Sequence, residues 1–84
     1  MNVKILGSGC RNCVATAELV AARAEALGVP VTIEKVTDYA AIAGYGVMRT
    51  PGVVIDGEVV HAGGVPQPAA IEGWLRARAG LAAG

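Results

Sequence analysis

Along the first half of the chain, the pattern of hydrophobic and polar residues changes from strand to helix and back. Asn2–Leu6 (NVKIL) alternates and contains β-branched residues, which is typical of a strand. Gly28 and Pro30 predict the end of a following helix, because glycine favours a helix C-terminus and proline cannot continue a helix. Val31–Val36 (VTIEKV) predicts a second strand. Between the two strands, apolar residues at spacings of three and four form one helical face: Cys13, Ala17, Val20, Ala21, Ala24 and Leu27.

The second half of the chain predicts a short helix, a hairpin and a last helix. Thr37 and Asp38 fit the cap and first turn of a short helix. Asp56 and Gly57 join two valine-rich segments, which favours a two-residue hairpin turn whose central residues both have positive φ. Pro68 suits the first turn of the last helix. That helix continues at helical spacing before the tail GLAAG, which is expected to fray: Ile71, Trp74, Leu75 and Arg78.

The length of the chain and the order of its elements predict one α/β domain, residues 1–84. The order is β-α-β-(short α)-β-β-α. A β-α-β unit needs parallel strands and a right-handed crossover, and the hairpin adds two antiparallel strands. We therefore expect a four-stranded mixed sheet with helices on both faces. The strands should lie in the order second, first, third, fourth, with the third antiparallel to the first.

Composition and charge restrict the classes of partner. Hydrophobic residues make up 54% of the chain, which is typical of a globular protein. Seven basic and seven acidic residues cancel, so no basic surface for nucleic acid is expected. The opening MNVKILGSG lacks the pattern of a secretory signal, and no segment reaches the roughly 18 apolar residues of a membrane span. We expect a cytoplasmic protein with no membrane partner.

Cys10 and Cys13 are the only cysteines, and they lie where the first strand passes into the first helix. A purely structural disulfide between them would close a very short loop. The chain-entropy estimate for such a loop is about 2 kcal/mol, and a cytosolic compartment would tend to reduce the bond. Two cysteines are also too few for a disulfide scaffold. This pair therefore favours thiol chemistry or metal binding over a structural role.

A reactive dithiol explains each feature of the segment GSGCRNC. The thiolate is the nucleophile, and a helix N-terminus stabilises it through unpaired N–H groups and the helix dipole. Cys10 would lie just before the helix and be exposed, while Cys13 would lie in the first turn and be shielded. Arg11 would add a positive charge nearby. Cys10 would then attack a substrate disulfide, and Cys13 would resolve the mixed disulfide.

Binding of a soft metal is the alternative for the same two thiolates. Two thiolates suit Cu(I), and small copper-carrying domains begin with a similar loop between a strand and a helix. Those domains usually have Met two residues before the first Cys, where this chain has Ser8, and they end in a strand. Zinc needs about four ligands, and only His61 remains, which we interpret as an exposed strand residue. The sequence predicts no metal site beyond Cys10 and Cys13.

Four segments together resemble a known family: ILGSGCRNC, VTD, YGVMRTPGVVIDGEVV and GGVP. They are similar to the small thioredoxin-like and glutaredoxin-like redox-active disulfide proteins, and the match covers nearly the whole chain. The resemblance implies a minimal thioredoxin-like fold without a bound cofactor. It implies a monomeric thiol–disulfide oxidoreductase that cycles a Cys10–Cys13 disulfide, with protein disulfides as substrates and a separate reductase as partner.

The resemblance also implies further site residues. In this fold the proline that matches Pro51 is cis and faces the dithiol, and the residue before it, here Thr50, offers backbone groups to a substrate. Proline lacks an N–H, so it suits the start of a strand that is open to a partner chain. The dipeptide alone favours an ordinary trans proline at the start of an edge strand, whereas the Cys pair and the order of the strands favour the cis form.

Two other segments differ from the family pattern. Gly63 and Gly64 resemble the glycine pair with which glutaredoxins hold glutathione. Their spacing from the proline is longer, however, and the usual acidic residue is absent, which argues against glutathione binding. Arg11 and Asn12 separate the cysteines, unlike the Gly-Pro of thioredoxins or the Pro-Tyr of glutaredoxins. The reduction potential and the reductase therefore stay open, with a soft-metal or metalloid carrier as the alternative function.

Overall fold

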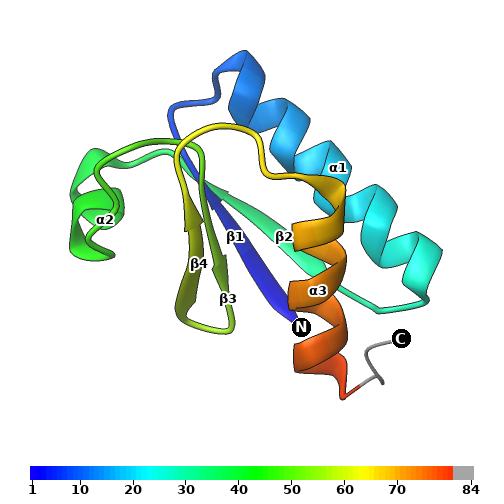
Figure 1. Ribbon diagram of the computed structural model, residues 1–84. Helices are drawn as coiled ribbons and strands as arrows, with labels where there is room; N and C mark the ends of the chain where they lie inside the picture. Colours follow the sequence, from blue (N-terminus) through cyan, green and yellow to red (C-terminus); the bar gives the residue numbers. More distant parts are fainter. Residues whose placement is uncertain (81–84) are drawn as a thin grey trace.

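The computed structural model describes residues 1–80 (Figure 1). The tail GLAAG that is expected to fray comprises residues 80–84, and all of it after Gly80 lies outside the described residues. Strands and helices follow one another in the predicted order. Their bounds are β1 (Asn2–Leu6), α1 (Arg11–Leu27), β2 (Thr32–Val36), α2 (Tyr39–Gly44), β3 (Gly52–Ile55), β4 (Glu58–Ala62) and α3 (Pro68–Ala79).

The four strands form one mixed sheet in the order β2-β1-β3-β4. β1 is parallel to β2 and antiparallel to β3, and β4 is antiparallel to β3. This arrangement follows from a parallel β-α-β unit to which a hairpin is added on the side of β1. The α/β fold class, the strand order and the antiparallel third strand are all confirmed.

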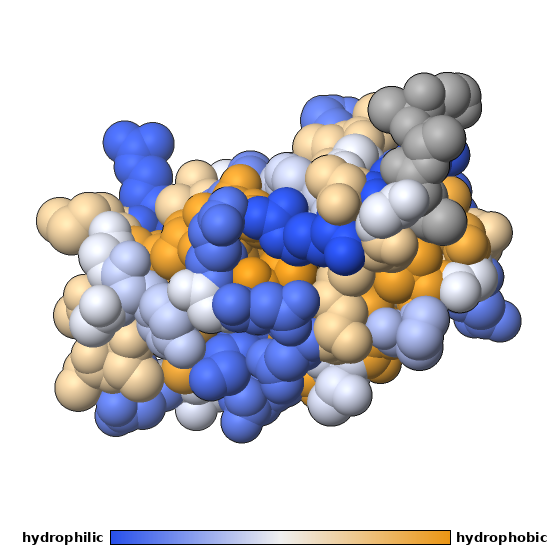
Figure 2. Space-filling model, turned by 90° about the horizontal axis from the view of Figure 1, so that it is seen from below, coloured by the Kyte–Doolittle hydropathy of each residue, from blue (hydrophilic) through white to orange (hydrophobic). Residues whose placement is uncertain are grey.

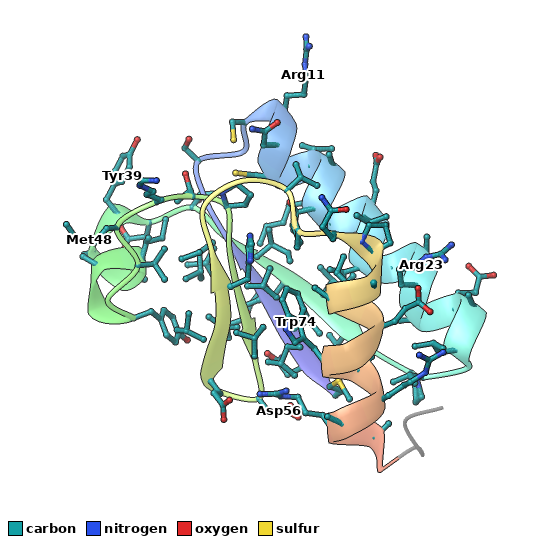
Figure 3. All side chains as sticks on the ribbon, in the orientation of Figure 1. Arg11, Arg23, Tyr39, Met48, Asp56 and Trp74 are labelled. Atoms are coloured by element: carbon teal, nitrogen blue, oxygen red, sulfur yellow. The ribbon has the colours of Figure 1, made fainter. Side chains whose placement is uncertain are left out.

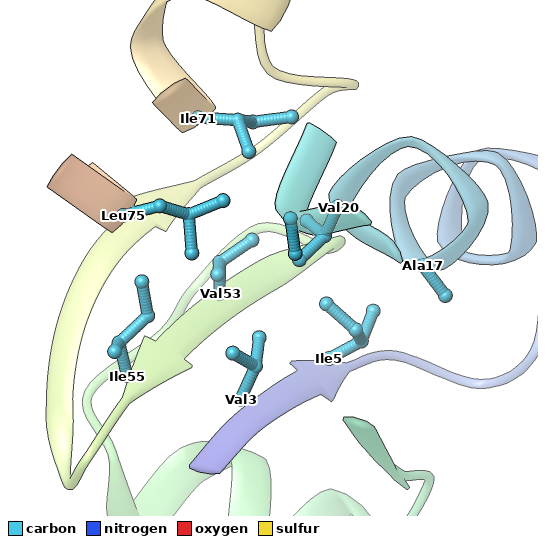
Figure 4. Packing of buried hydrophobic residues seen from close by; sticks show 9 residues of the cluster. Val3, Ile5, Ala17, Val20, Val53, Ile55, Ile71 and Leu75 are labelled. Atoms are coloured by element: carbon cyan, nitrogen blue, oxygen red, sulfur yellow. The ribbon is translucent and has the colours of Figure 1, made fainter. Parts of the chain in front are cut away.

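Helices α1 and α3 cover one face of the sheet (Figures 1 and 4). Residues that alternate along β1 and β3 point toward these helices, because successive side chains of a strand lie on opposite faces. The helices contribute their own apolar residues to the same core, so one buried cluster joins the two layers. Its members are Val3, Ile5, Ala17, Val20, Ala24, Val53, Ile55, Ile71 and Leu75.

Helix α2 covers part of the opposite face, which confirms helices on both sides. Leu6 and Val54 point toward it and pack with Ile42 and Val47 in a second, smaller cluster. The carboxylate of Asp38 accepts a hydrogen bond from the N–H of Ala41 at 3.0 Å and caps this short helix. The helix is present as predicted, but its N-cap is Asp38 and not Thr37.

The predicted buried face of α1 is wrong at one position. Ala21 is exposed, and Thr16 is buried in its place. The Thr16 hydroxyl donates to the Asn12 carbonyl oxygen at 2.7 Å, so the helix itself satisfies the polar group that burial removes from water. The end of the helix is confirmed, because Gly28 adopts the left-handed conformation at φ 69°.

The predicted hairpin turn is present between β3 and β4. Asp56 and Gly57 have φ values of 47° and 87°, so both central residues are in the positive range. The Asp56 carboxylate also accepts from the N–H of Asn2 at 2.9 Å, which ties the turn to β1. A register shift between Val53 and Val54 forms a bulge that the sequence did not predict.

Figure 2 views the molecule from the end of the sheet where this turn lies. Polar side chains occupy much of this end, and hydrophobic residues are visible between them. Arg78 of α3 donates to Glu58 of β4 at 2.7 Å, which links the last helix to the hairpin. Within residues 1–80, no helix is long and apolar enough to cross a membrane.

Candidate functional site

The two cysteines lie in a loop that the sheet holds in place. Directly after β1, the Gly7 N–H donates to the carbonyl oxygen of Val36 at the end of β2, at 2.9 Å. Gly9 then turns the chain with a positive φ of 82°, and Cys10 follows in an extended conformation as the N-cap of α1. The first helical bond runs from the Val14 N–H to the Cys10 carbonyl. Cys10 therefore begins the helix, as expected.

The sulfur atoms of Cys10 and Cys13 lie 2.8 Å apart, and both cysteines are free thiols. Cys10 is exposed, whereas Cys13 is 5% exposed. The two-residue spacer thus brings two sulfurs together in unequal surroundings. This is the arrangement that an attacking thiol and a resolving thiol need.

The two thiols have pKa values shifted in opposite directions. The pKa of Cys10 is lowered, first by the hydrogen bond from the Cys13 thiol and then by nearby backbone N–H groups in the first turn of α1. The pKa of Cys13 is raised, first by burial and then by the bond to Cys10. Arg11 extends away from the molecule (Figure 3), so the first turn and Cys13, rather than Arg11, favour the Cys10 thiolate.

Thr50 and Pro51 approach this loop from the start of β3. Their peptide bond is cis, Pro51 is buried and Thr50 is exposed. A Cβ atom placed on Gly7 would lie 3.5 Å from the Cβ of Thr50 and would collide with the sulfur of Cys13. Thr50 and Cys13 therefore face the same small space beside Gly7, although they lie far apart in the sequence.

Gly63 and Gly64 form a turn beside Pro51. The Gly63 N–H donates to the Pro51 carbonyl at 2.9 Å, and both glycines have positive φ, 88° and 72°. The Nε2 atom of His61 lies 3.0 Å from the Gly64 carbonyl oxygen. Its ring also packs on Trp74, with centroids 5.7 Å apart. His61 is therefore partly buried in contact with α3, and not the exposed strand residue that the sequence suggested.

Two observations bear on metal binding. Within residues 1–80, no group of three or more His, Cys, Asp or Glu residues is placed to hold a metal ion. The last element of this part of the chain is helix α3, not the edge strand in which small copper-carrying domains end. A Cu(I) site made of the two thiolates of Cys10 and Cys13 needs no third ligand, so only the order of the elements bears on the soft-metal alternative.

Gly7 is the residue of this site that sequence reasoning missed. It lies in the segment GSGCRNC, but no role at the site was predicted for it. Its closeness to the Cys13 sulfur depends on how α1 packs back onto the sheet, so the local sequence does not predict this contact. A small residue directly before a cysteine loop is the single feature that could have drawn attention to it.

A dithiol at the start of the first helix of a four-stranded mixed sheet, with a cis proline just before the third strand, is typical of a thiol–disulfide protein with a thioredoxin fold. Comparison with known proteins agrees. A family model described as a thioredoxin domain matches residues 1–76. A curated protein named thioredoxin, from Methanocaldococcus jannaschii, is 39% identical over 74 residues, which cover 88% of this chain and 85% of that protein. The chain belongs to the thioredoxin family, whose members are thiol–disulfide oxidoreductases.

Proposed function

We propose that this protein reduces or exchanges disulfides in other proteins by cycling between a Cys10–Cys13 dithiol and a disulfide. One observation carries the proposal: two sulfurs lie 2.8 Å apart, one exposed with a lowered pKa and one buried with a raised pKa. A thiolate that is both accessible and stabilised near neutral pH is the reactive species in thiol–disulfide exchange.

Reduction of a substrate would proceed in two exchanges. The Cys10 thiolate attacks one sulfur of the substrate disulfide, a mixed disulfide forms, and the other substrate sulfur leaves as a thiolate and takes up a proton. Cys13 then loses its proton to solvent and attacks the Cys10 sulfur, which releases the second substrate sulfur. Two electrons pass from the dithiol to the substrate, and Cys10 and Cys13 end as a disulfide.

Return of the disulfide to the dithiol requires a second protein, a reductase that supplies two electrons through its own thiols. No bound cofactor takes part, because the two sulfurs carry both electrons. We place this cycle in the cytoplasm, where the reducing environment keeps the dithiol available. We further propose that residues 1–84 act as a single monomeric domain.

The substrate would dock on the surface around the sulfurs. Thr50 is exposed beside Cys13, and Pro51 lacks an N–H, so this edge is open to an extended partner segment. Met48 is 94% exposed on the same loop and offers an apolar contact (Figure 3). We do not propose glutathione as a substrate, because the turn after β4 lacks the acidic residue that follows the glycine pair in glutaredoxins. The residues proposed to contact the substrate are Arg11, Asn12, Thr50, Pro51, Gly63 and Gly64.

The test is reduction of a disulfide-bonded protein such as insulin, with dithiothreitol as the electron donor. The wild type should accelerate the reaction, Cys10→Ser should not, and Cys13→Ser should accumulate a mixed disulfide that mass spectrometry detects. If Cys13 alkylates faster than Cys10 in the reduced protein, the two roles are reversed. A wild type that binds Cu(I) tightly but does not accelerate reduction would favour the carrier function instead.

A further inference from the structure

Gly7 is buried next to the sulfur of Cys13, and its lack of a side chain leaves room for this atom. A Cβ atom at this position would collide with the Sγ of Cys13, and it would also lie 3.4 Å from the Cβ of Cys13 and 3.5 Å from the Cβ of Thr50. The φ angle of Gly7 is not in the positive range, so the backbone itself would accept any L-amino acid. Space for the sulfur, and not backbone conformation, is what requires glycine here.

We propose that Gly7 is a positioning residue for Cys13, whose missing side chain lets the buried sulfur lie against Cys10. The consequence for reactivity rests on the proposed function, whereas the spatial relation between Gly7 and Cys13 does not. A substitution of Gly7 leaves all four residues from Cys10 to Cys13 unchanged.

The surroundings of Gly7 leave little freedom to absorb a methyl group. Its N–H donates to Val36, and the preceding residue, Leu6, is paired with β2 on one side and β3 on the other. The backbone of Gly7 is thus fixed between two neighbouring strands. Thr50 closes the space from a further direction. The strain would therefore fall on the Cys13 side chain, which has to rotate or shift with the start of α1.

Either movement of Cys13 separates the two sulfurs. The hydrogen bond between them, now 2.8 Å, would lengthen or break. That bond is the largest cause of the lowered pKa of Cys10. A methyl group at Gly7 would thus change the ionisation of Cys10, a residue that it does not touch.

Other glycines of the chain supply matched controls. A Cβ at Gly52 would lie 3.0 Å and 3.3 Å from the two methyl groups of Val47, so Gly52→Ala crowds the core without touching a sulfur. A Cβ at Gly73 would have no neighbour within 4 Å, and Gly73 has no positive φ, so Gly73→Ala fills open space. Gly52→Ala therefore controls for general destabilisation, and Gly73→Ala controls for the addition of a methyl group alone. Neither variant displaces the Cys13 sulfur.

The first measurement is the pH dependence of Cys10 alkylation in the reduced protein. Gly7→Ala should move the profile to higher pH and slow alkylation at neutral pH by roughly tenfold, the change that corresponds to one pKa unit. Gly52→Ala and Gly73→Ala should leave the profile unchanged. A Gly7→Ala profile that coincides with that of Gly52→Ala would overturn the proposal.

The second measurement is a double-mutant cycle on stability, which needs no redox activity and so distinguishes failure of this inference from failure of the proposed function. Gly7→Ala should destabilise the protein less when Cys13 is replaced by Ala, because the colliding sulfur is gone. The expected difference is on the order of tenfold in the unfolding equilibrium constant. Gly52→Ala should cost the same in both backgrounds.

The cycle remains decisive if Gly7→Ala alone does not fold. The double variant Gly7→Ala with Cys13→Ala should then fold, and circular dichroism with urea unfolding would detect the recovery. The proposal that Gly7 leaves room for the Cys13 sulfur would be contradicted by an unfolded double variant. It would also be contradicted if Gly7→Ala destabilised the protein equally with and without that sulfur.

Discussion

The thiols of Cys10 and Cys13 share a hydrogen bond of 2.8 Å that joins an exposed sulfur to a buried one. Because the Cys10 pKa is lowered and the Cys13 pKa is raised, the first proton to leave the pair comes from Cys10. The Cys13 S–H then donates to a thiolate, which is a stronger acceptor than a thiol. The geometry therefore assigns the two sulfurs different charges over the same range of pH.

The first prediction concerns the pH dependence of alkylation. With rising pH, Cys10 should begin to react with iodoacetamide below the usual range of a free thiol, and Cys13 should react only above that range. Mass spectrometry of peptides from the reduced protein, labelled briefly at each pH, would follow both residues. Equal profiles for the two cysteines would contradict the unequal ionisation of the pair.

The second prediction concerns the stability of the reduced protein. A lowered pKa in the folded state makes stability rise as pH passes from the folded to the unfolded value, so Cys10 contributes a rise. A raised pKa makes stability fall as pH passes from the unfolded to the folded value, so Cys13 contributes a fall. Urea unfolding should therefore show a maximum near the ordinary thiol pKa. In Cys10→Ser the rise should disappear.

The third prediction concerns the effect of the Cys13 hydrogen bond on the pKa of Cys10. Cys13→Ala should raise the pKa of Cys10, because the hydrogen bond from Cys13 is the largest cause of its lowering. Cys13→Ser keeps a hydroxyl that can donate, so its effect should be smaller. Ultraviolet absorbance of the thiolate during a pH titration of each variant measures the difference. An unchanged Cys10 pKa in both variants would assign its lowering to the backbone N–H groups of α1 instead.

Much of the fold could be predicted because its signals are local. Gly28 ends a helix, and Asp56–Gly57 makes a turn, through backbone preferences that each residue carries by itself. The order of the strands then follows from the handedness of one crossover. That Thr16 and not Ala21 lies on the buried face of α1 could not be predicted. Both residues fit a helical period, and only packing against the sheet selects between them.

The candidate site shows the same division. Cys10 and Cys13 were found from their spacing and from their place before a helix. The contact of His61 with Trp74 joins β4 to α3, and the space beside Gly7 is shared with α1 and the start of β3. These relations depend on how separate elements pack, so they leave no pattern along the chain.

The fourth prediction tests the core below the site. Leu75 is fully buried between α3 and the sheet (Figure 4), and Leu75→Ala should lower the free energy of unfolding by about 2–5 kcal/mol. Val59 on the edge strand β4 is 38% exposed, so Val59→Ala should cost about 0.5 kcal/mol or less. Urea unfolding followed by Trp74 fluorescence measures both. A similar loss in both variants would contradict the placement of the core.

The last prediction concerns the cap of α2. The Asp38 carboxylate accepts the N–H of Ala41 at 3.0 Å, and loss of such a cap costs about 1 kcal/mol. Asp38→Ala should cost this amount and speed hydrogen exchange at Ile42, whose N–H bonds to the Asp38 carbonyl in the first turn. Asp38→Asn keeps an acceptor and should cost only a few tenths of a kcal/mol. Because α2 packs on the face of the sheet opposite α1, neither variant should change the alkylation profile of Cys10. A changed profile in Asp38→Ala alone would mean that α2 supports the dithiol through the Thr50 loop.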